Sequence, residues 1–260
     1  MTGKFTFATR EEGFDNHIDG SIRGYGALWQ DIVDISQYFV ENDTLVVDIG
    51  CSTGKMLKSM IEQNKFASRA MYEGVEIEED FYGAYDKDEE EYKQLSYYRG
   101  DVLDYYFTNV SYATSIFTLQ FMSHADRKRV IEKVYDGLNP GGAFVFAEKT
   151  MPESVRIHEI RTFTYYDFKR RTFTTDDIMD KEKQLRHMTK PSTRQELIDR
   201  LELRATVCYD NGFWVGYNQG YEEAFARCME TITEIKNAHN TCRCSNLDKT
   251  LLALVAVGDE

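Results

Sequence analysis

The residues best suited to chemistry lie in the segment VVDIGCSTG, at positions 46–54. An acid that ends an apolar run is followed there by a Gly-x-x-x-Gly turn, in the order Asp48, Gly50, Cys51, Ser52 and Gly54. Glycines let a turn approach a ligand closely, and the N-terminus of a following helix directs N–H groups toward that ligand. We therefore expect a dinucleotide or adenosyl ligand at this turn. Residue 52 is Ser, so the turn lacks the Gly-x-Gly-x-x-Gly spacing of nicotinamide sites, and a purely structural turn is the alternative.

Two later loops carry acids where a nucleoside needs them. Glu76 and Ile77 end the next apolar stretch, where an acid can hydrogen-bond a ribose diol. Asp101 and Val102 follow the stretch after that, where the carboxylate could accept from an adenine amino group and the Val102 N–H could donate to a ring nitrogen. Glu76 also lies among other acids, so a solvated charge is the alternative for it. Together the three loops predict an adenosine site.

The elements that must position these loops alternate between apolar strands and amphipathic helices. We expect strands at 44–49, 70–77, within 96–105, at 112–121 and at 143–149, and helices at 26–40, 55–63 and 125–138. Such βαβ winding favours parallel strands with helices on both faces. The pattern predicts an α/β fold with a Rossmann-like sheet whose carboxyl edge holds the ligand.

The pattern changes after residue 150, where long charged helices are expected at 156–170 and 175–188. We interpret them as a lid over the carboxyl ends of the strands or as an oligomer element. Ser192 is a plausible N-cap of a further helix. Two last strands, expected at 204–209 and 250–257, complete a mostly parallel seven-stranded sheet, and a helix is expected between them near 222–238.

We predict one domain with four parts. They are an N-terminal helical cap at 1–43, a cofactor-binding core at 44–150, a lid or dimerisation element at 151–190, and a C-terminal part at 191–260 with a helical insertion at about 214–245.

The net charge and the composition exclude some classes of binding partner. The 260 residues include 31 Lys and Arg against 44 Asp and Glu, a formal net charge of −13. Nucleic-acid binding relies on a basic face, so we expect no direct nucleic-acid binding. The longest apolar runs fall well short of the roughly 20 residues of a membrane span. The first residues lack the apolar stretch of a signal peptide, and we expect a cytoplasmic protein with no membrane partner.

The cysteines do not predict a metal site. Five cysteines, an odd number with uneven spacing, indicate thiols in a reducing compartment. Four residues are of types that bind zinc, namely Cys228, His239, Cys242 and Cys244. Their Cys-x-Cys spacing with one distant His lacks the usual two-residue separation, so we expect no metal.

Several stretches resemble, in order and spacing, the carboxy-S-adenosylmethionine synthase family within the class I S-adenosylmethionine-dependent methyltransferase fold. They are FDNHIDGSIRGYGALW at 14–29, DIGCS at 48–52, FTLQF at 117–121, VYDGLNPGGAFVFAEK at 134–149 and DFKR at 167–170. The resemblance covers most of residues 14–205. It implies a homodimer that makes the carboxymethyl donor for tRNA wobble-uridine modification. In the implied reaction, the sulfonium methyl group of S-adenosylmethionine is deprotonated to an ylide, which captures carbon dioxide released from prephenate, leaving phenylpyruvate.

The resemblance also implies roles for individual residues. Tyr25, Gly50, Cys51 and Ser52 would surround the methionine part, Glu76 with Ile77 the ribose, and Asp101 with Val102 the adenine, while Asp48 and Ile116 also belong to the cofactor site. Arg200 would clamp the transferred carboxylate, which makes Arg200 and Tyr25 the expected catalytic residues. A guanidinium suits this task because its fork holds a carboxylate bidentately. The alternative for Arg200 is a helix-surface pair with Glu196.

Other arginines are candidates for binding a dianionic substrate, although each could equally be a solvated charge. They are Arg23, Arg170 and Arg171. An acidic protein that binds an anion must concentrate cations locally, because its overall field repels anions.

The chain departs from the family pattern in places. Ile116 stands where the family has an asparagine that contacts the ligand, and Glu76 stands where it has an aspartate. Beyond Val207 the resemblance fades. Two alternatives therefore stay open: a methyltransferase with a different acceptor, and a non-catalytic paralogue that keeps the cofactor pocket.

Overall fold

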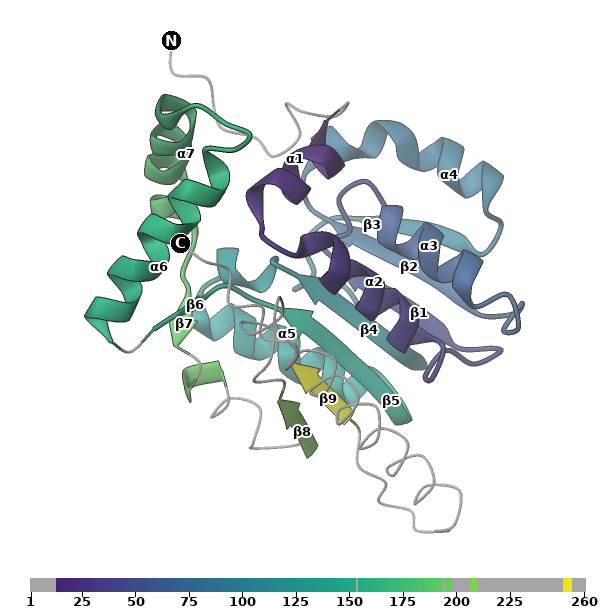
Figure 1. The fold of residues 1–260 in the computed structure, drawn as a ribbon. Coiled ribbons are helices and arrows are strands. Elements are labelled where there is room, and N and C mark those ends of the chain that lie inside the picture. The colour runs from purple at the N-terminus through teal and green to yellow at the C-terminus, as the bar shows by residue number, and fades with distance from the viewer. Residues whose placement is uncertain (1–12, 153, 194, 198–205, 210–249, 254–260) are drawn as a thin grey trace.

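The computed structural model describes residues 13–152, 154–193, 195–197, 206–209 and 250–253. Its centre is a parallel sheet with the strand order β3-β2-β1-β4-β5 (Figure 1). The strands are β1 (Leu45–Ile49), β2 (Met71–Glu76), β3 (Leu95–Arg99), β4 (Val110–Ile116) and β5 (Leu138–Ala147). The order reverses between β1 and β4, which opens a crevice at the carboxyl ends of these strands. This arrangement confirms the predicted Rossmann-like fold.

Two short strands extend the sheet beyond β5. β9 (Thr250–Ala253) pairs with β5, and β8 (Thr206–Tyr209) pairs with β9, both in parallel. The predicted insertion between them lies outside the described residues, as does Arg200.

Helices cover both faces of the sheet, which is why β1 and β4 are buried along almost their whole length. α2 (Tyr25–Ser36) and α3 (Lys55–Gln63) pack on one face, and α5 (His124–Gly137) packs on the other (Figure 1). Fully buried side chains fill the first layer, among them Leu28, Ile32 and Tyr112. Val130, Val134 and Phe144 belong to the second layer.

The remaining helices border the carboxyl edge of the sheet, except for the helix Tyr85–Glu91, which packs beside β3. They are α1 (Phe14–Ser21), the 3-10 helix η1 (Glu79–Ala84), α4 (Tyr85–Glu91), the 3-10 helix η2 (Leu119–Phe121), α6 (Val155–Lys169) and α7 (Thr175–Met188). α6 and α7 lie side by side to one side of the sheet (Figure 1). β6 (Thr150–Met151) pairs in parallel with β7 (Ser192–Thr193), so the two chain segments that flank this helix pair meet. No helix in the described ranges is both long and apolar enough to cross a membrane.

The predicted strand at 112–121 is too long. β4 ends at Ile116 because Phe117 adopts φ 56°, a left-handed conformation that cannot continue a strand, and η2 follows. β5 instead begins earlier than predicted, at Leu138, because that residue pairs with Val110 across a register shift.

The predicted N-cap at Ser192 is wrong by one residue. Ser192 lies in β7, and its hydroxyl accepts a 2.9 Å hydrogen bond from Nη1 of buried Arg127. Thr193 Oγ1 accepts from the Glu196 N–H at 3.2 Å, and Glu196 Oε2 accepts from the Thr193 N–H at 2.9 Å. This reciprocal pair is a capping box, so Thr193 is the cap.

Candidate active site

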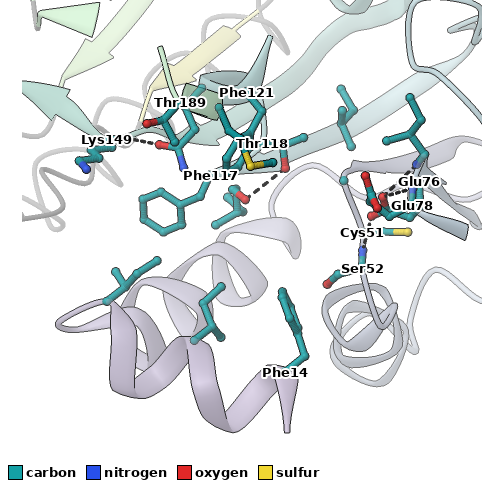
Figure 2. Close-up of a pocket in the computed structure, with 18 of the residues that line it drawn as sticks. Phe14, Cys51, Ser52, Glu76, Glu78, Phe117, Thr118, Phe121, Lys149 and Thr189 are labelled. Atoms are coloured by element: carbon teal, nitrogen blue, oxygen red, sulfur yellow. Dashed lines mark hydrogen bonds between the residues drawn. The ribbon is translucent and has the colours of Figure 1, made fainter. Parts of the chain in front are cut away.

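A cavity of about 790 Å³ opens at the carboxyl edge of the sheet (Figure 2). Its lining comes from the loops after the central strands and from α1, α6 and α7. All ten residues that the sequence assigned to the cofactor line this cavity, namely Tyr25, Asp48, Gly50, Cys51, Ser52, Glu76, Ile77, Asp101, Val102 and Ile116. The fold therefore brings together residues that are up to 91 positions apart, counting from 25 to 116.

The turn after β1 needs its glycines. Gly50 and Gly54 have φ values of 75° and 68°, and Ser52 between them is also left-handed at 45°. A Cβ atom on Gly50 would lie 2.2 Å from Thr118 Oγ1, and one on Gly54 would lie 2.0 Å from the Tyr97 hydroxyl oxygen. Close packing and positive φ thus both require glycine. α3 begins at Lys55, so its N-terminus adjoins this turn.

Glu76 ties the turn after β1 to the loop after β2. Its Oε2 accepts a 2.9 Å hydrogen bond from the Ser52 N–H, and its Oε1 accepts from the N–H groups of Ile77 and Glu78, both at 2.9 Å (Figure 2). The residue is 6% exposed, so the solvated-charge interpretation is wrong. Burial raises the pKa of this carboxyl, while the three backbone N–H groups oppose that rise.

Asp48 lies deeper in the same edge. Its Oδ1 accepts a 2.7 Å hydrogen bond from Thr114 Oγ1, and it is 4% exposed. Burial raises the pKa of Asp48 to about 7; the Thr114 bond lowers it and the Glu76 charge raises it further. A cation placed nearby would favour the ionised carboxylate.

Tyr25 borders the cavity from α2, with its ring centroid 6.4 Å from that of Phe117. Burial, followed by the nearby charges of Asp48, Asp15 and Asp19, raises the pKa of its hydroxyl well above the ordinary value. Tyr25 is therefore a neutral hydroxyl that can donate a hydrogen bond, and it does not serve as a base at neutral pH.

The residues that the sequence assigned to adenine, Asp101 and Val102, lie after β3. Asp101 Oδ1 accepts a 2.9 Å hydrogen bond from the Leu103 N–H, which fixes the carboxylate in its loop. Val102 is buried and packs into the core. Ile116, at the end of β4, packs against the other core layer, the one that contains α2 and α3.

A pair of stacked, buried tyrosines contacts the glycine turn through the Ser52 carbonyl. No sequence motif indicated this pair. Tyr85 and Tyr97 stack with ring centroids 3.7 Å apart and planes within 4°. The Tyr85 hydroxyl donates to the Ser52 carbonyl oxygen and lies 3.6 Å from Cys51 Sγ. The Tyr97 hydroxyl donates to Asp88 Oδ2 at 3.0 Å. The turn is thus held by Glu76 at the Ser52 N–H and by Tyr85 at the Ser52 carbonyl.

The wall opposite the acidic loops is basic, which sequence reasoning also missed. Lys169 on α6 and Lys181 on α7 line the cavity, as does His17 on α1. Of the three arginines considered for anion binding, only Arg23 lines it; Arg170 instead pairs with Asp167 at 2.8 Å. Arg171 lies over the Phe168 ring, 5.8 Å from its centroid, and is absent from the lining.

Comparisons with known proteins agree with this picture. The family profile described as "Methyltransferase domain" matches residues 46–142. The chain is 37% identical over 198 residues to a carboxy-S-adenosyl-L-methionine synthase of Staphylococcus epidermidis, covering 74% of this chain and 85% of the relative. A synthase of the same name from Shewanella woodyi is 30% identical over 219 residues, covering 80% and 88%.

Proposed function

Because the chain belongs to the carboxy-S-adenosyl-L-methionine synthase family, we propose that it converts S-adenosylmethionine and prephenate into carboxy-S-adenosylmethionine and phenylpyruvate. Membership of this family identifies the chain as an enzyme that uses S-adenosylmethionine and has a methyltransferase-like domain. The family resemblance noted in the sequence is confirmed, as is the use of S-adenosylmethionine. The identity of the second substrate, prephenate, is the proposed part.

One observation carries the proposal: a single cavity has acids at the ends of the strands and cations on the facing helices. Buried Asp48 and Glu76 stand on the strand side, and Lys181 stands on the helical side, next to Lys169, whose charge Glu182 offsets. A sulfonium is a cation and prephenate is a dianion, so this polarity suits the two molecules side by side. Local cations also overcome the repulsion that a net charge of −13 exerts on an anion.

The chain's own residues would bind and orient the nucleoside. Glu76 uses three acceptor positions on backbone N–H groups, and a carboxylate offers about four, so a ribose hydroxyl can still donate to it. Asp101 would accept from the adenine amino group. When bound, S-adenosylmethionine supplies a methyl carbon activated by the adjacent sulfonium. The Tyr25 hydroxyl would donate to the methionine part.

The overall reaction balances without another reactant. Prephenate loses carbon dioxide and a ring hydroxide to become phenylpyruvate. The methyl group loses a proton and gains the carbon dioxide through a new carbon–carbon bond, and the proton and hydroxide make water. The walls of the cavity would hold the carbon dioxide beside the methyl carbon until that bond forms.

The experiment supplies the purified protein with S-adenosylmethionine and prephenate that carries isotopically labelled carbon in its ring carboxylate. We expect a nucleoside heavier by one labelled carboxyl group, together with phenylpyruvate, in mass spectra. S-adenosylhomocysteine with a methylated acceptor would instead identify a methyltransferase. Cofactor binding with no product of either kind would identify a non-catalytic paralogue.

On the same grounds we propose that the protein is a cytoplasmic homodimer whose product serves tRNA modification. A stripe of exposed apolar side chains on α6 supports the dimer, since Ile157, Ile160 and Phe163 are 43%, 50% and 66% exposed. Contiguous apolar patches often mark interfaces. Light scattering of the wild type and of Phe163→Glu tests it: we expect a dimer that the charged variant weakens.

A further inference from the structure

We propose that Lys181, positioned by His17, is the subsite that binds a carboxylate of the second substrate. The inference deepens the proposed function and rests on it for the identity of that substrate. It assigns the task to described residues on α1 and α7, in addition to any role of Arg200.

The geometry places the two side chains together at the cavity. Lys181 Nζ lies within hydrogen-bond distance of His17 Nε2, although 164 residues separate them. Ser21 Oγ lies 3.1 Å from the same imidazole nitrogen. All three residues line the cavity. A cation, an imidazole and a hydroxyl therefore converge at one point where α1 meets α7.

The hydrogen-bond chemistry leaves Lys181 able to bind an anion. An ammonium has three donors and no acceptor, so Lys181 donates and His17 Nε2 accepts. The His17 ring is held in turn against Phe173, with centroids 4.9 Å apart and planes tilted by 58°. Fixing a long side chain before the ligand arrives reduces the entropy lost on binding.

The two lysines of this wall contact different kinds of side chain. Lys169 Nζ lies 3.5 Å from Glu182 Oε1, and the two side chains are only 2% and 7% exposed. The charges of that buried pair largely offset each other. Lys181 faces a histidine, so the partner at this contact adds no negative charge.

The opposite side of the cavity repels carboxylates when the buried carboxyl groups of Asp48 and Glu76 are ionised. An anionic substrate is therefore driven toward the α1–α7 side, while the sulfonium nucleoside is drawn to the acids. This separation of charge would orient the anionic substrate and the sulfonium nucleoside relative to each other in a single way.

The test measures prephenate binding by calorimetry, using full-length protein saturated with S-adenosylhomocysteine. Lys181→Met should weaken prephenate binding at least about tenfold, because the variant loses a charge-assisted hydrogen bond. Its affinity for S-adenosylmethionine should stay within about twofold. Lys181→Arg should retain most of the prephenate affinity. Inorganic phosphate, titrated in place of prephenate, should bind far more weakly; equal binding would show a general anion site and overturn the substrate assignment.

Lys183→Met is the matched control. Lys183 lies on the same helix, is 80% exposed, pairs with Asp180 at 3.9 Å and is absent from the cavity lining. We expect it to bind prephenate like the wild type. Equal losses in Lys181→Met and Lys183→Met, or no prephenate binding by the wild type, would overturn the inference.

The outcome is separable from that of the proposed function. Prephenate binding that depends on Lys181, without formation of a carboxylated nucleoside, would support the subsite and refute the synthase activity. If Lys181→Met forms product and keeps the wild-type affinity and KM for prephenate, the synthase activity is supported and the subsite is refuted. Circular dichroism and the thermal midpoint of each variant establish that it is folded.

Discussion

The Glu76 carboxylate accepts a hydrogen bond from the Ser52 backbone N–H at 2.9 Å, so the acid that ends β2 holds the turn that follows β1. The same carboxylate accepts from its own loop through the other oxygen. One buried side chain therefore sets the separation of two loops that both border the cavity. This relationship makes Glu76 a structural support as well as a proposed ribose ligand.

Glu76→Gln should weaken S-adenosylmethionine binding about tenfold, near 1.4 kcal/mol. The amide replaces one acceptor oxygen with a donor, so either the Ser52 N–H or the pair at Ile77 and Glu78 loses its partner, and an unsatisfied buried N–H costs about 1–3 kcal/mol. Calorimetric titration measures the affinity. Glu79→Gln, an exposed neighbour, is the control and should bind normally. Identical affinities in both variants would contradict the role of Glu76.

Gly50→Ala should destabilise the fold by about 2 kcal/mol or more, because the added Cβ meets Thr118 and the backbone is left-handed. Gly26→Ala provides the contrast: its nearest neighbour would be 3.8 Å away within helix α2, so stability should be unchanged or rise by up to about 1 kcal/mol. Urea denaturation gives both values. A Gly50 variant as stable as the Gly26 variant would refute the packing argument.

Asp48 should make both stability and binding depend on pH. Burial raises its folded pKa to about 7, above the ordinary value of 3.8, so the protonated form is favoured in the native state. Its contribution to stability is complete below the ordinary pKa and is lost as the pH rises through about 7. In Asp48→Asn this component of the pH dependence should disappear, which denaturation at a series of pH values detects.

The same shift predicts how the ligand binds. If the sulfonium lies near Asp48, it favours the carboxylate, and S-adenosylmethionine affinity should rise as the pH increases through about 7. The uncharged sulfur of S-adenosylhomocysteine should show a much flatter profile. Parallel profiles for the two nucleosides would place the sulfonium away from Asp48.

Tyr85→Phe should weaken S-adenosylmethionine binding about threefold to tenfold and lower stability by about 1 kcal/mol. The variant keeps the ring that stacks on Tyr97 but loses the hydroxyl that donates to the Ser52 carbonyl, so the turn becomes less ordered. Calorimetry and thermal unfolding measure the two effects. Tyr106→Phe, at a residue 80% exposed, is the control and should change neither quantity.

Much of the fold was readable from sequence because each signal was local. The helix predicted at 55–63 coincides with α3, and the helix predicted at 175–188 coincides with α7. Two of the errors occurred where a distant partner acts on the chain. Ser192 is drawn into β7 by pairing with Thr150, and Leu138 joins β5 by pairing with Val110.

The meeting of the predicted cofactor residues in one cavity was anticipated because these residues follow consecutive strands, and parallel strands bring their carboxyl ends to one edge whatever the remaining packing. Each such loop is a short segment with an acid at or near the end of its strand, and the chain order alone brings these segments to one edge. The basic wall and the tyrosine support have no such motif. His17 meets Lys181, and Tyr85 meets Ser52, only because separate helices pack over the same edge of the sheet. Contacts of that kind depend on helix orientation and side-chain packing in three dimensions, and no spacing along the chain encodes them.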